Sequence, residues 1–532
     1  MKLSNQLLII VGFIGIVSSC ARKGRPQGGP KDETAPIMVI AKPPHETTNF
    51  EEKTIKIYFD EYIVLKDLNK QLVISPPLKN PPLITPQGTP SKFISIKLLD
   101  TLKPNTTYTF NFGSAVQDNN ENNKLENFKY VFSTGNYIDS LTTQGTVADA
   151  ISPKLKKNIS VLLYEIDSTY TDSIVYKQKP SYVANTADSL NYKFTNLKQG
   201  KYYVVGLDET STDYIFNPKT DKIGFIIDTI NLPKDSIIKK PLTVFKEEQK
   251  FNFKRGKEAV KGRIEFGFEG KQTDFNVKLL SKVPDTFKAF TQLQQDKDTL
   301  NYWHTPIEAD SLLFEVKNNA FLDTVTVFLR KEKIDSLAVN SNVSNVLHLN
   351  DTLFLTTNTP ITKIDTTKFS LVDKDTVSVT HQIKQKSINK IAVLFEAKPK
   401  NRYTLDVLPK AITDLFEVAN DSLNYKFGTK DTEDYGSITL TVDKKVESPV
   451  IIELLIKDKV VKTSYIKNSQ IVTFDLLEPK EYTIRAIIDA NGNNQWDTGN
   501  FLNKTQPEKI IYFDKQPQVR ANWSINENFI IE

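Results

Sequence analysis

Cysteine and histidine are scarce in this chain of 532 residues. The single cysteine, Cys20, excludes an intramolecular disulfide and a cysteine-rich metal site. The four histidines lie far apart along the sequence, which leaves little for zinc coordination: His45, His304, His348 and His381. These absences disfavour a metalloenzyme.

Catalytic motifs and a large net charge are missing as well. The sequence has no Gly-x-Ser-x-Gly, Walker loop, Gly-x-Gly-x-x-Gly or His-Glu-x-x-His motif. Two Ser-x-x-Lys matches, at 387–390 and 464–467, fall in expected strands or turns rather than at a helix start. The net charge of +5 is too small over this length to indicate nucleic-acid binding. We therefore predict a non-enzymatic protein, although a carboxylate pair for glycoside hydrolysis stays open because its spacing is a tertiary property.

The first residues have the pattern of a secretory signal. Lys2 is followed by an apolar run, 7–17, that is too short to span a bilayer comfortably and ends in small residues before Cys20. Residues 17–20 resemble the lipobox of bacterial lipoproteins, in which the cysteine is diacylated and becomes the first residue of the mature chain. The resemblance implies a signal peptide over 1–19 and a lipid anchor on Cys20, and two or three acyl chains suffice for stable anchoring.

The residues after Cys20 predict a flexible tether and the cellular location of the protein. Residues 20–34 are rich in Gly, Pro and charge, which is typical of a flexible linker. The segment resembles the start of Bacteroidota-type lipoproteins. Because Ala21 is not the aspartate that retains lipoproteins in the inner membrane, the resemblance implies the outer membrane. Arg22, Lys23 and Arg25 stand where surface-exported lipoproteins carry an acidic cluster, so we favour the periplasmic face over the cell surface.

The rest of the chain has the alternating pattern of short β-strands. Residues 54–59, 108–112 and 437–442 alternate apolar and polar side chains, and Asn, Asp, Pro and Lys turns separate such stretches. Glycine is limited to 20 residues, and long helical periodicity is hard to find. The predicted fold class is all-β, with tandem antiparallel β-sandwiches.

Two kinds of segment recur at long range, which predicts two alternating domain types. In the first type, the Lys-Pro-x-x-x-Tyr-Thr stretch 103–109 recurs as 398–404, and Asp118 recurs as Asp414. The second type has a Phe, a Tyr eight residues later and an Asp at the strand end. These residues are Phe194, Tyr202 and Asp208 in one copy, and Phe474, Tyr482 and Asp489 in the other.

Both domain types resemble known modules. Pro36, the strand ending at 59–61, the 103–109 segment and the closing strand 131–134 make residues 35–135 similar to the bacterial Ig-like domain of surface-layer proteins. Its second, diverged copy is expected at 342–430. The second repeat makes the domains at 136–249 and 431–532 similar to transthyretin-like or B-type collagen-adhesin sandwiches. Between the two pairs of repeats, residues 250–341 are expected to form a β-rich domain that resembles no known family.

One loop has the oxygen spacing of a calcium site. Four side chains occupy positions 1, 3, 5 and 9 of the span 489–500: Asp489, Asn491, Asn493 and Asp497. The span departs from an EF-hand where Asn494 replaces the turn glycine and Asn500 replaces the bidentate glutamate. Calcium is the one cofactor that the sequence suggests, and the alternative is an Asn- and Gly-rich loop held by Asx turns.

A short tripeptide is strongly over-represented. Asp, then Ser or Thr, then an aliphatic residue or Thr, begins at fifteen of the 37 aspartates. The tripeptide resembles the acceptor of the general periplasmic O-glycosylation system of Bacteroidota-type bacteria. The alternative is that Asp opens turns and Ser or Thr opens strands. The serine candidates are Ser140, Ser168, Ser173, Ser189, Ser236, Ser311, Ser336 and Ser422.

Together these features predict a lipoprotein anchored in the outer membrane that acts as a scaffold or interaction protein. Its expected partners are the membrane, through the lipid, and other envelope proteins, but not nucleic acid. One alternative is an accessory subunit of an outer-membrane machine for protein insertion or secretion. Another is a glycan-binding lipoprotein, in which Trp303 and Trp496 would stack on sugars.

Overall fold

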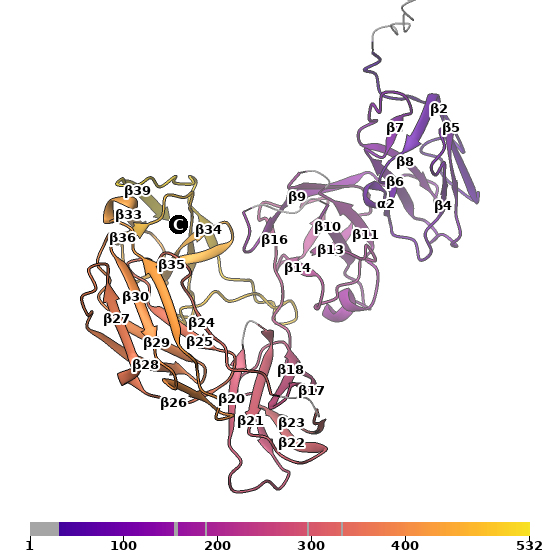
Figure 1. Cartoon of the computed structure of the whole chain (residues 1–532). Coiled ribbons are helices and arrows are strands. Elements are labelled where there is room, and N and C mark those ends of the chain that lie inside the picture. Colours follow the sequence, from indigo (N-terminus) through magenta and orange to yellow (C-terminus); the bar gives the residue numbers. More distant parts are fainter. Residues whose placement is uncertain (1–30, 154–157, 187–188, 295–296, 331–333) are drawn as a thin grey trace, which may run out of the picture.

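The computed structural model describes residues 31–153, 158–186, 189–294, 297–330 and 334–532. About half of the chain is strand, at 50%, and 3% is helix, which confirms the predicted all-β class of tandem Ig-like sandwiches. Paired sheets form five domains, which we number D1 to D5 from the N-terminus (Figure 1). The signal peptide, Cys20 and nearly all of the predicted tether lie outside the described residues.

D1 is a sandwich of two antiparallel sheets. Its elements are β1 (Met38–Lys42), β2 (Thr54–Leu65), α2 (Leu68–Gln71), β3 (Val73–Ser75), β4 (Leu83–Thr85), β5 (Ser91–Lys97), β6 (Thr107–Gly113), β7 (Val116–Asp118) and β8 (Phe128–Ser133). The larger sheet has the order β1-β2-β5-β4, with β7 paired to β2, and the smaller has β3-β6-β8. Alternate residues such as Ile55 and Ile57 point inward and meet Phe110 of the other sheet in one core.

D2 is a second sandwich, and it has one parallel pair. Its elements are β9 (Leu141–Asp149), β10 (Ser160–Glu165), η1 (Asp172–Tyr176), β11 (Tyr182–Asn185), β12 (Asn191–Leu197), β13 (Gly200–Asp208), β14 (Lys222–Phe225), β15 (Ile230–Leu232) and β16 (Leu242–Val244). The orders are β11-β10-β13-β14, with β15 on β13, and β12-β9-β16. β16 runs parallel to β9. Strand β10 is buried on both faces, because one face lies in the core and the other belongs to a second apolar cluster.

D3 packs a four-stranded sheet on a three-stranded one. Its strands are β17 (Asn252–Val260), β18 (Arg263–Glu269), β19 (Asn276–Leu279), β20 (Ala289–Gln294), β21 (Thr299–His304), β22 (Ser311–Asn318) and β23 (Phe321–Phe328). The orders are β17-β18-β21-β20 and β19-β22-β23. Aromatic side chains fill the space between the sheets, and the ring of Phe314 contacts those of Phe266 and Tyr302 there.

D4 is built on the plan of D1. Its elements are β24 (Val339–Ser341), β25 (Leu353–Thr357), β26 (Ile361–Ile364), η3 (Thr366–Lys368), β27 (Phe369–Asp373), β28 (His381–Ser387), β29 (Lys390–Phe395), β30 (Arg402–Val407), β31 (Ile412–Asp414) and β32 (Leu423–Gly428). The sheets are β24-β25-β29-β28, β27-β30-β32 and the pair β26-β31. The repeated segment makes the same bonds in both domains. The hydroxyl of Tyr108 accepts from the Lys103 amide at 2.9 Å, and that of Tyr403 accepts from the Lys398 amide at 2.8 Å.

D5 repeats the plan of D2. Its elements are β33 (Gly436–Lys444), which follows η4 (Thr432–Asp434), then β34 (Val450–Ile456), β35 (Lys459–Ile466), β36 (Gln470–Leu477), β37 (Thr483–Ile488), β38 (Ile510–Tyr512) and β39 (Ser524–Ile531). The orders are β36-β33-β39 and β35-β34-β37-β38, and β39 runs parallel to β33. Tyr202 donates to the Lys198 carbonyl at 3.0 Å in D2, and Tyr482 donates to the Glu478 carbonyl at 2.9 Å in D5.

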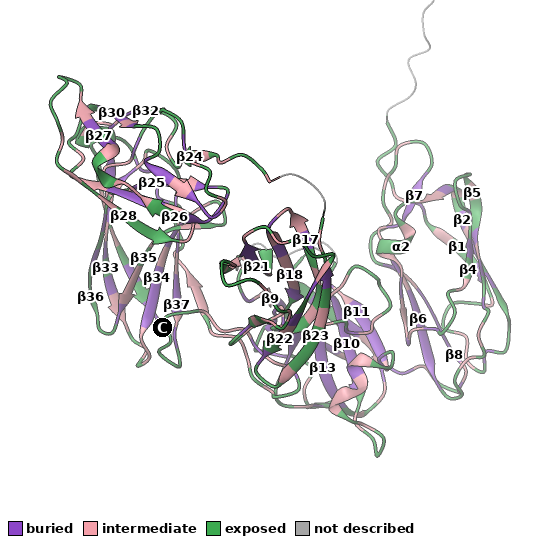
Figure 2. Ribbon diagram, turned by 60° about the horizontal axis from the view of Figure 1, so that its bottom comes forward, coloured by how far each residue is buried: buried purple, intermediate pink, exposed green. Residues whose placement is uncertain are grey.

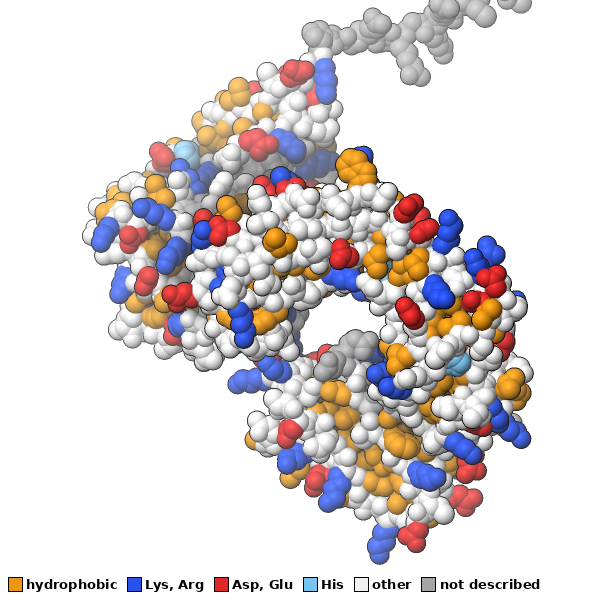
Figure 3. Space-filling model, turned by 90° about the vertical axis from the view of Figure 1, so that its left-hand side faces the viewer, with side chains coloured by type: hydrophobic (Ala, Val, Ile, Leu, Met, Phe, Trp, Pro, Cys, Tyr) orange, Lys and Arg blue, Asp and Glu red, His pale blue; other side chains and the backbone are white. Residues whose placement is uncertain are grey.

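The chain turns back on itself after D2. In Figure 1 the fourth and fifth domains curve round, and the yellow C-terminal part reaches the second domain again. Figure 2 shows that the buried residues lie mainly in the strands, and Figure 3 shows an opening through the molecule. Hydrogen bonds between residues more than 250 positions apart close this arrangement between D5 and D2.

Candidate functional sites

The contact that closes the chain is made by one loop of D5, which we call the arm: residues 495–509, between β37 and β38. Phe501 of the arm is 0% exposed and inserts into the outer apolar cluster of D2. Its ring centroid lies 5.4 Å from that of Phe225 and 6.0 Å from that of Tyr203. Its amide donates to Glu247 Oε1 at 2.6 Å. Burial raises the pKa of Glu247, and this hydrogen bond opposes the rise.

Lys504 adds a cation to the same contact. Its Nζ donates to Asp172 Oδ1 at 2.8 Å and to the Tyr203 hydroxyl at 3.2 Å. The same atom lies 4.4 Å from the ring centroids of Tyr203 and of Phe501. The arm therefore combines an apolar anchor with a partly buried cation, as protein interfaces do.

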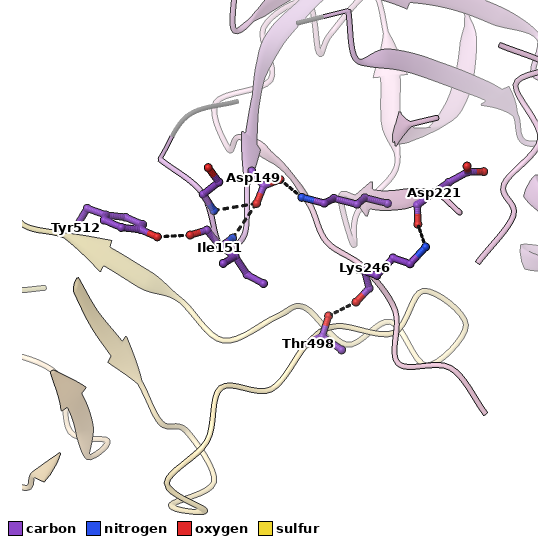
Figure 4. Close-up of polar contacts among 8 residues, drawn as sticks. Asp149, Ile151, Asp221, Lys246, Thr498 and Tyr512 are labelled. Atoms are coloured by element: carbon purple, nitrogen blue, oxygen red, sulfur yellow. Dashed lines mark hydrogen bonds and ion pairs between the residues drawn. The ribbon is translucent and has the colours of Figure 1, made fainter. Parts of the chain in front are cut away.

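Polar contacts continue along the junction (Figure 4). Thr498 Oγ1 donates to the Lys246 carbonyl at 2.6 Å, and Lys246 Nζ donates to the Asp221 carbonyl at 3.2 Å. The Tyr512 hydroxyl donates to the carbonyl of Ile151 in D2. Three cavities lie at domain junctions: one of 510 Å³ and one of 1140 Å³ between D2 and D5, and one of 660 Å³ between D4 and D5. The junctions of D5 with D2 and with D4 therefore contain cavities as well as interdomain hydrogen bonds.

The predicted calcium loop, 489–500, begins before the arm and overlaps its first residues. The Asp489 carboxylate is buried and accepts from the amides of Gly492, Asn493 and Asn494. The side-chain amides of Asn491 and Asn493 both donate to Asp497 Oδ2, at 2.6 and 2.8 Å. The four predicted residues therefore converge, and the backbone amides of this loop are satisfied by Asx-type hydrogen bonds to Asp489, Asn491 and Asn493.

Glu508 is a member of this loop that the sequence pattern missed. Its two carboxylate oxygens accept from the amides of Ala490 and Asp497. Burial, together with the charges of Asp497 and Asp489, raises the pKa of Glu508. Within the described ranges no group of three or more His, Cys, Asp or Glu side chains is placed to hold a metal ion. No local signal could have identified Glu508, because it follows Asp489 by 19 residues and belongs to the far end of the arm.

Calcium binding stays a prediction with a direct test. A site that binds only the folded state raises the melting temperature in proportion to the logarithm of the ligand concentration above its dissociation constant. We expect millimolar calcium, compared with chelator, to raise the melting temperature of the wild type but not that of Asp489→Asn plus Asp497→Asn. Equal melting temperatures of the wild type in the two buffers would leave these residues as turn formers.

The histidines do not meet one another. His304 is 0% exposed in D3, where its Nδ1 pairs with the Thr305 carbonyl at 2.9 Å and its Nε2 lies 3.7 Å from Glu258 Oε1. Burial above all lowers the pKa of His304, and the nearby Glu258 opposes that shift. His348 instead bridges two domains, because its Nε2 lies 2.8 Å from the Leu476 carbonyl of D5. The contacts of His304 lie within D3, and that of His348 joins D4 to D5.

Of the two tryptophans named for glycan stacking, Trp303 is buried, so the expectation is wrong for Trp303, whereas Trp496 stays partly exposed. Trp303 is 4% exposed because β21 lies inside its sheet and Arg263 covers the ring at 5.3 Å. Trp496 is half-buried against the D2 cluster, and its Nε1 donates to the Glu508 carbonyl at 3.0 Å. The two Ser-x-x-Lys serines lie in strands, Ser387 in β28 and Ser464 in β35, as expected.

The eight serine candidates for glycosylation all have accessible positions. Six are exposed: Ser140, Ser168, Ser189, Ser236, Ser336 and Ser422. Ser173 and Ser311 are half-buried, Ser173 because it lies in η1 directly after the Asp172 that binds the arm. Exposure is a requirement for a sugar acceptor, and it does not by itself identify one.

No helix in the described ranges has the length and hydropathy of a membrane span. Residues 32–134, essentially D1, match the family model described as "Bacterial Ig-like domain". No curated protein matches the sequence.

Solved structures with similarity to the chain include domains 1–6 of the surface-layer protein SbsC, at 13% identity, covering 91% of this chain and 67% of that one, with a TM-score of 0.15. The Bacillus anthracis TIE protein has 11% identity, coverages of 95% and 76%, and a TM-score of 0.15. The major pilin subunit BcpA of Bacillus cereus has 10% identity, coverages of 74% and 99%, and a TM-score of 0.13.

Proposed function

We propose that the protein is a non-enzymatic scaffold of the cell envelope, anchored through Cys20 to the periplasmic face of the outer membrane. The observation that carries the proposal is the docking of the D5 arm on D2, because it fixes domains that a flexible string would leave independent. A closed arrangement holds loops and sheet edges at set distances for partners to bind. The proposed partners are envelope proteins. As one example of this role, the protein would be an accessory subunit of an outer-membrane machine for protein insertion or secretion.

Contacts at the other junctions support the same role. Thr107 Oγ1 donates to Asp139 Oδ2 at 2.7 Å between D1 and the start of D2. Gln292 of D3 donates to Asn389 of D4 at 3.0 Å. A scaffold that holds its domains in fixed positions is expected to have such polar contacts at each domain junction, since they define the orientation of one domain relative to the next.

Replacing Cys20 with serine tests the anchor. A serine hydroxyl is not a substrate for the diacyl transfer that the lipobox implies, so the variant should be lost from the outer-membrane fraction. The measurement is detergent-free fractionation of native cells, with Ser19→Ala as the matched control that keeps the cysteine. Complete retention of Cys20→Ser with the outer membrane would rule out lipid anchoring as the mechanism.

We also propose O-glycosylation at several of the exposed tripeptides. Purified protein from a native host should then exceed the mass of the chain plus lipid by discrete additions. Because the additions need accessible hydroxyls, Ser140→Ala and Ser168→Ala should each remove one of them, whereas Ser160→Ala in the buried strand β10 should remove none. An intact mass equal to chain plus lipid would assign the tripeptides to turn and strand formation alone.

A further inference from the structure

The exposed face of the larger D1 sheet has an unusual composition. Strand register places ten outward side chains on it, alternating with buried residues such as Ile57 and Ile94. We call this set the outer face: Ile40, Lys42, Thr54, Lys56, Tyr58, Leu83, Thr85, Phe93, Ser95 and Lys97. It contains three lysines and four large apolar or aromatic residues, and the next outward residue of β2 beyond Tyr58 is the exposed Asp60.

The apolar members are grouped rather than scattered. Ile40 pairs with Tyr58 and Tyr58 pairs with Phe93, so the three form one row across β1, β2 and β5. Ile40 is 50% exposed and Phe93 is 37% exposed. Leu83, at 56%, lies at the opposite corner beside Lys97. Single exposed apolar residues are ordinary, but a contiguous row marks an interaction surface.

The lysines lie beside this row. Lys42 pairs with Lys56 one step along the strands, and both are exposed. Lys56 Nζ lies 5.6 Å from the centroid of the Phe93 ring. Asp60 follows Tyr58 by two positions on β2, and its carboxylate accepts from the Ile37 amide at 2.9 Å. The outer face therefore presents more positive than negative charge beside an apolar row.

In the part of the chain that the structure describes, the hydrogen bonds between D1 and D2 lie away from the outer face. Contacts with D2 reach the opposite sheet and one loop of D1: Asp139 binds Thr107 of β6, and Lys179 Nζ donates to the Leu78 carbonyl at 2.7 Å. The Ser75 side chain of β3 accepts from the Val183 amide at 3.1 Å. The surface is thus available in the closed arrangement of the five domains.

We propose that the outer face of D1 rests on the phospholipid headgroups of the bilayer that holds the anchor, an inference that rests on the proposed lipid anchoring. Aromatic and aliphatic side chains flanked by lysines are the pattern of interfacial membrane contacts, since the rings sit at headgroup depth and the lysines meet phosphates. Each lysine near an anionic surface strengthens binding, and the effect decays within about one Debye length, about 8–10 Å at ordinary salt.

The position at which the chain enters D1 also favours the membrane as the partner of the outer face. Strand β1 begins beside the apolar row, and Ile37 and Val39 next to it are 64% and 65% exposed. The eleven residues from Ala21 to Lys31 span at most about 40 Å when fully extended. A lipid on Cys20 therefore keeps this end of D1 within reach of the membrane, and its lysines Lys42, Lys56 and Lys97 add to the cations of the tether.

A labelling experiment tests the orientation of D1. The chain from Ala21 onward contains no cysteine, so Thr85→Cys on the outer face and Gln382→Cys on β28 of D4 each accept one dye. A histidine tag in place of Cys20 binds the protein to vesicles of phosphatidylcholine and phosphatidylglycerol that contain a nickel-chelating lipid and a headgroup nitroxide. We expect strong quenching of the dye at position 85 and little at position 382. Equal quenching at the two positions would overturn the proposal.

A binding experiment without the tag separates the face from the anchor. The untagged chain from Ala21 should sediment with phosphatidylglycerol-containing vesicles at low salt. Replacing Lys42, Lys56 and Lys97 with glutamine should weaken binding by roughly 100-fold, whereas Lys384→Gln plus Lys386→Gln on D4 should change it little. Unchanged binding of the triple variant would overturn the proposal. Neither result depends on acylation, so a failure here is distinct from a failure of the Cys20 test.

Discussion

Replacing Phe501 with alanine is expected to release the arm from D2 and open the molecule while all five domains stay folded. The side chain is fully buried between Tyr176, Tyr203 and Phe225, although it belongs to a different domain from these rings. Removing a buried phenylalanine costs about 3–5 kcal/mol. The remaining contact of Lys504 with Asp172 is partly exposed to solvent, so it offsets little of that loss.

Leu502 provides the matched control for this prediction. It is the next residue of the same arm and is 53% exposed, so Leu502→Ala removes apolar atoms without emptying the D2 pocket. Small-angle scattering should show a larger radius of gyration for Phe501→Ala only, and hydrogen exchange should accelerate across the arm and over β13 and β14. A Phe501→Ala protein with the dimensions and protection of the wild type would mean that other contacts close the molecule.

The domain plan could be predicted because its signal is local and repeated. Inward residues of β2 such as Ile55 and Ile57 alternate with polar ones, and this period of two defines a strand and its buried face. The repeat at Tyr108 and Tyr403 could be identified because the same hydrogen bond to the preceding lysine amide requires the same spacing. Features of this kind can be predicted because a few neighbouring residues determine them.

The arm could not be predicted, because its partners are distant and its own sequence has no period. Phe501 lies among Asn, Thr and Gly residues, and Tyr203 precedes it by nearly 300 positions. The error at Trp303 has a related cause. An alternating strand predicts one exposed face, but both faces of β21 are buried, and the guanidinium of Arg263 lies over the Trp303 ring. Arg263 belongs to the neighbouring strand β18, so this cover cannot be identified from the pattern of β21 alone.

Replacing Glu258 with alanine is expected to destabilise D3 more than any other charge removal in that domain. The side chain of Glu258 is 0% exposed, and its Oε1 accepts from the amide of Gly262 at 2.8 Å. Its Oε2 accepts from the amide of Arg330, and His304 lies beside it. Removing one member of a buried polar group that leaves its partners unsatisfied costs about 3–5 kcal/mol.

The conservative variant and a surface variant make this prediction specific. Glu258→Gln keeps one acceptor oxygen and should lose about 1–3 kcal/mol, the cost of one unsatisfied donor. Glu265→Ala on the neighbouring strand β18 removes partly exposed ion pairs with Lys257 and Arg263, and it should cost at most about 1 kcal/mol. Calorimetry of the full chain, with hydrogen exchange across 252–328 to assign the transition to D3, measures all three. Equal losses for Glu258→Ala and Glu265→Ala would contradict a structural role of the buried carboxylate.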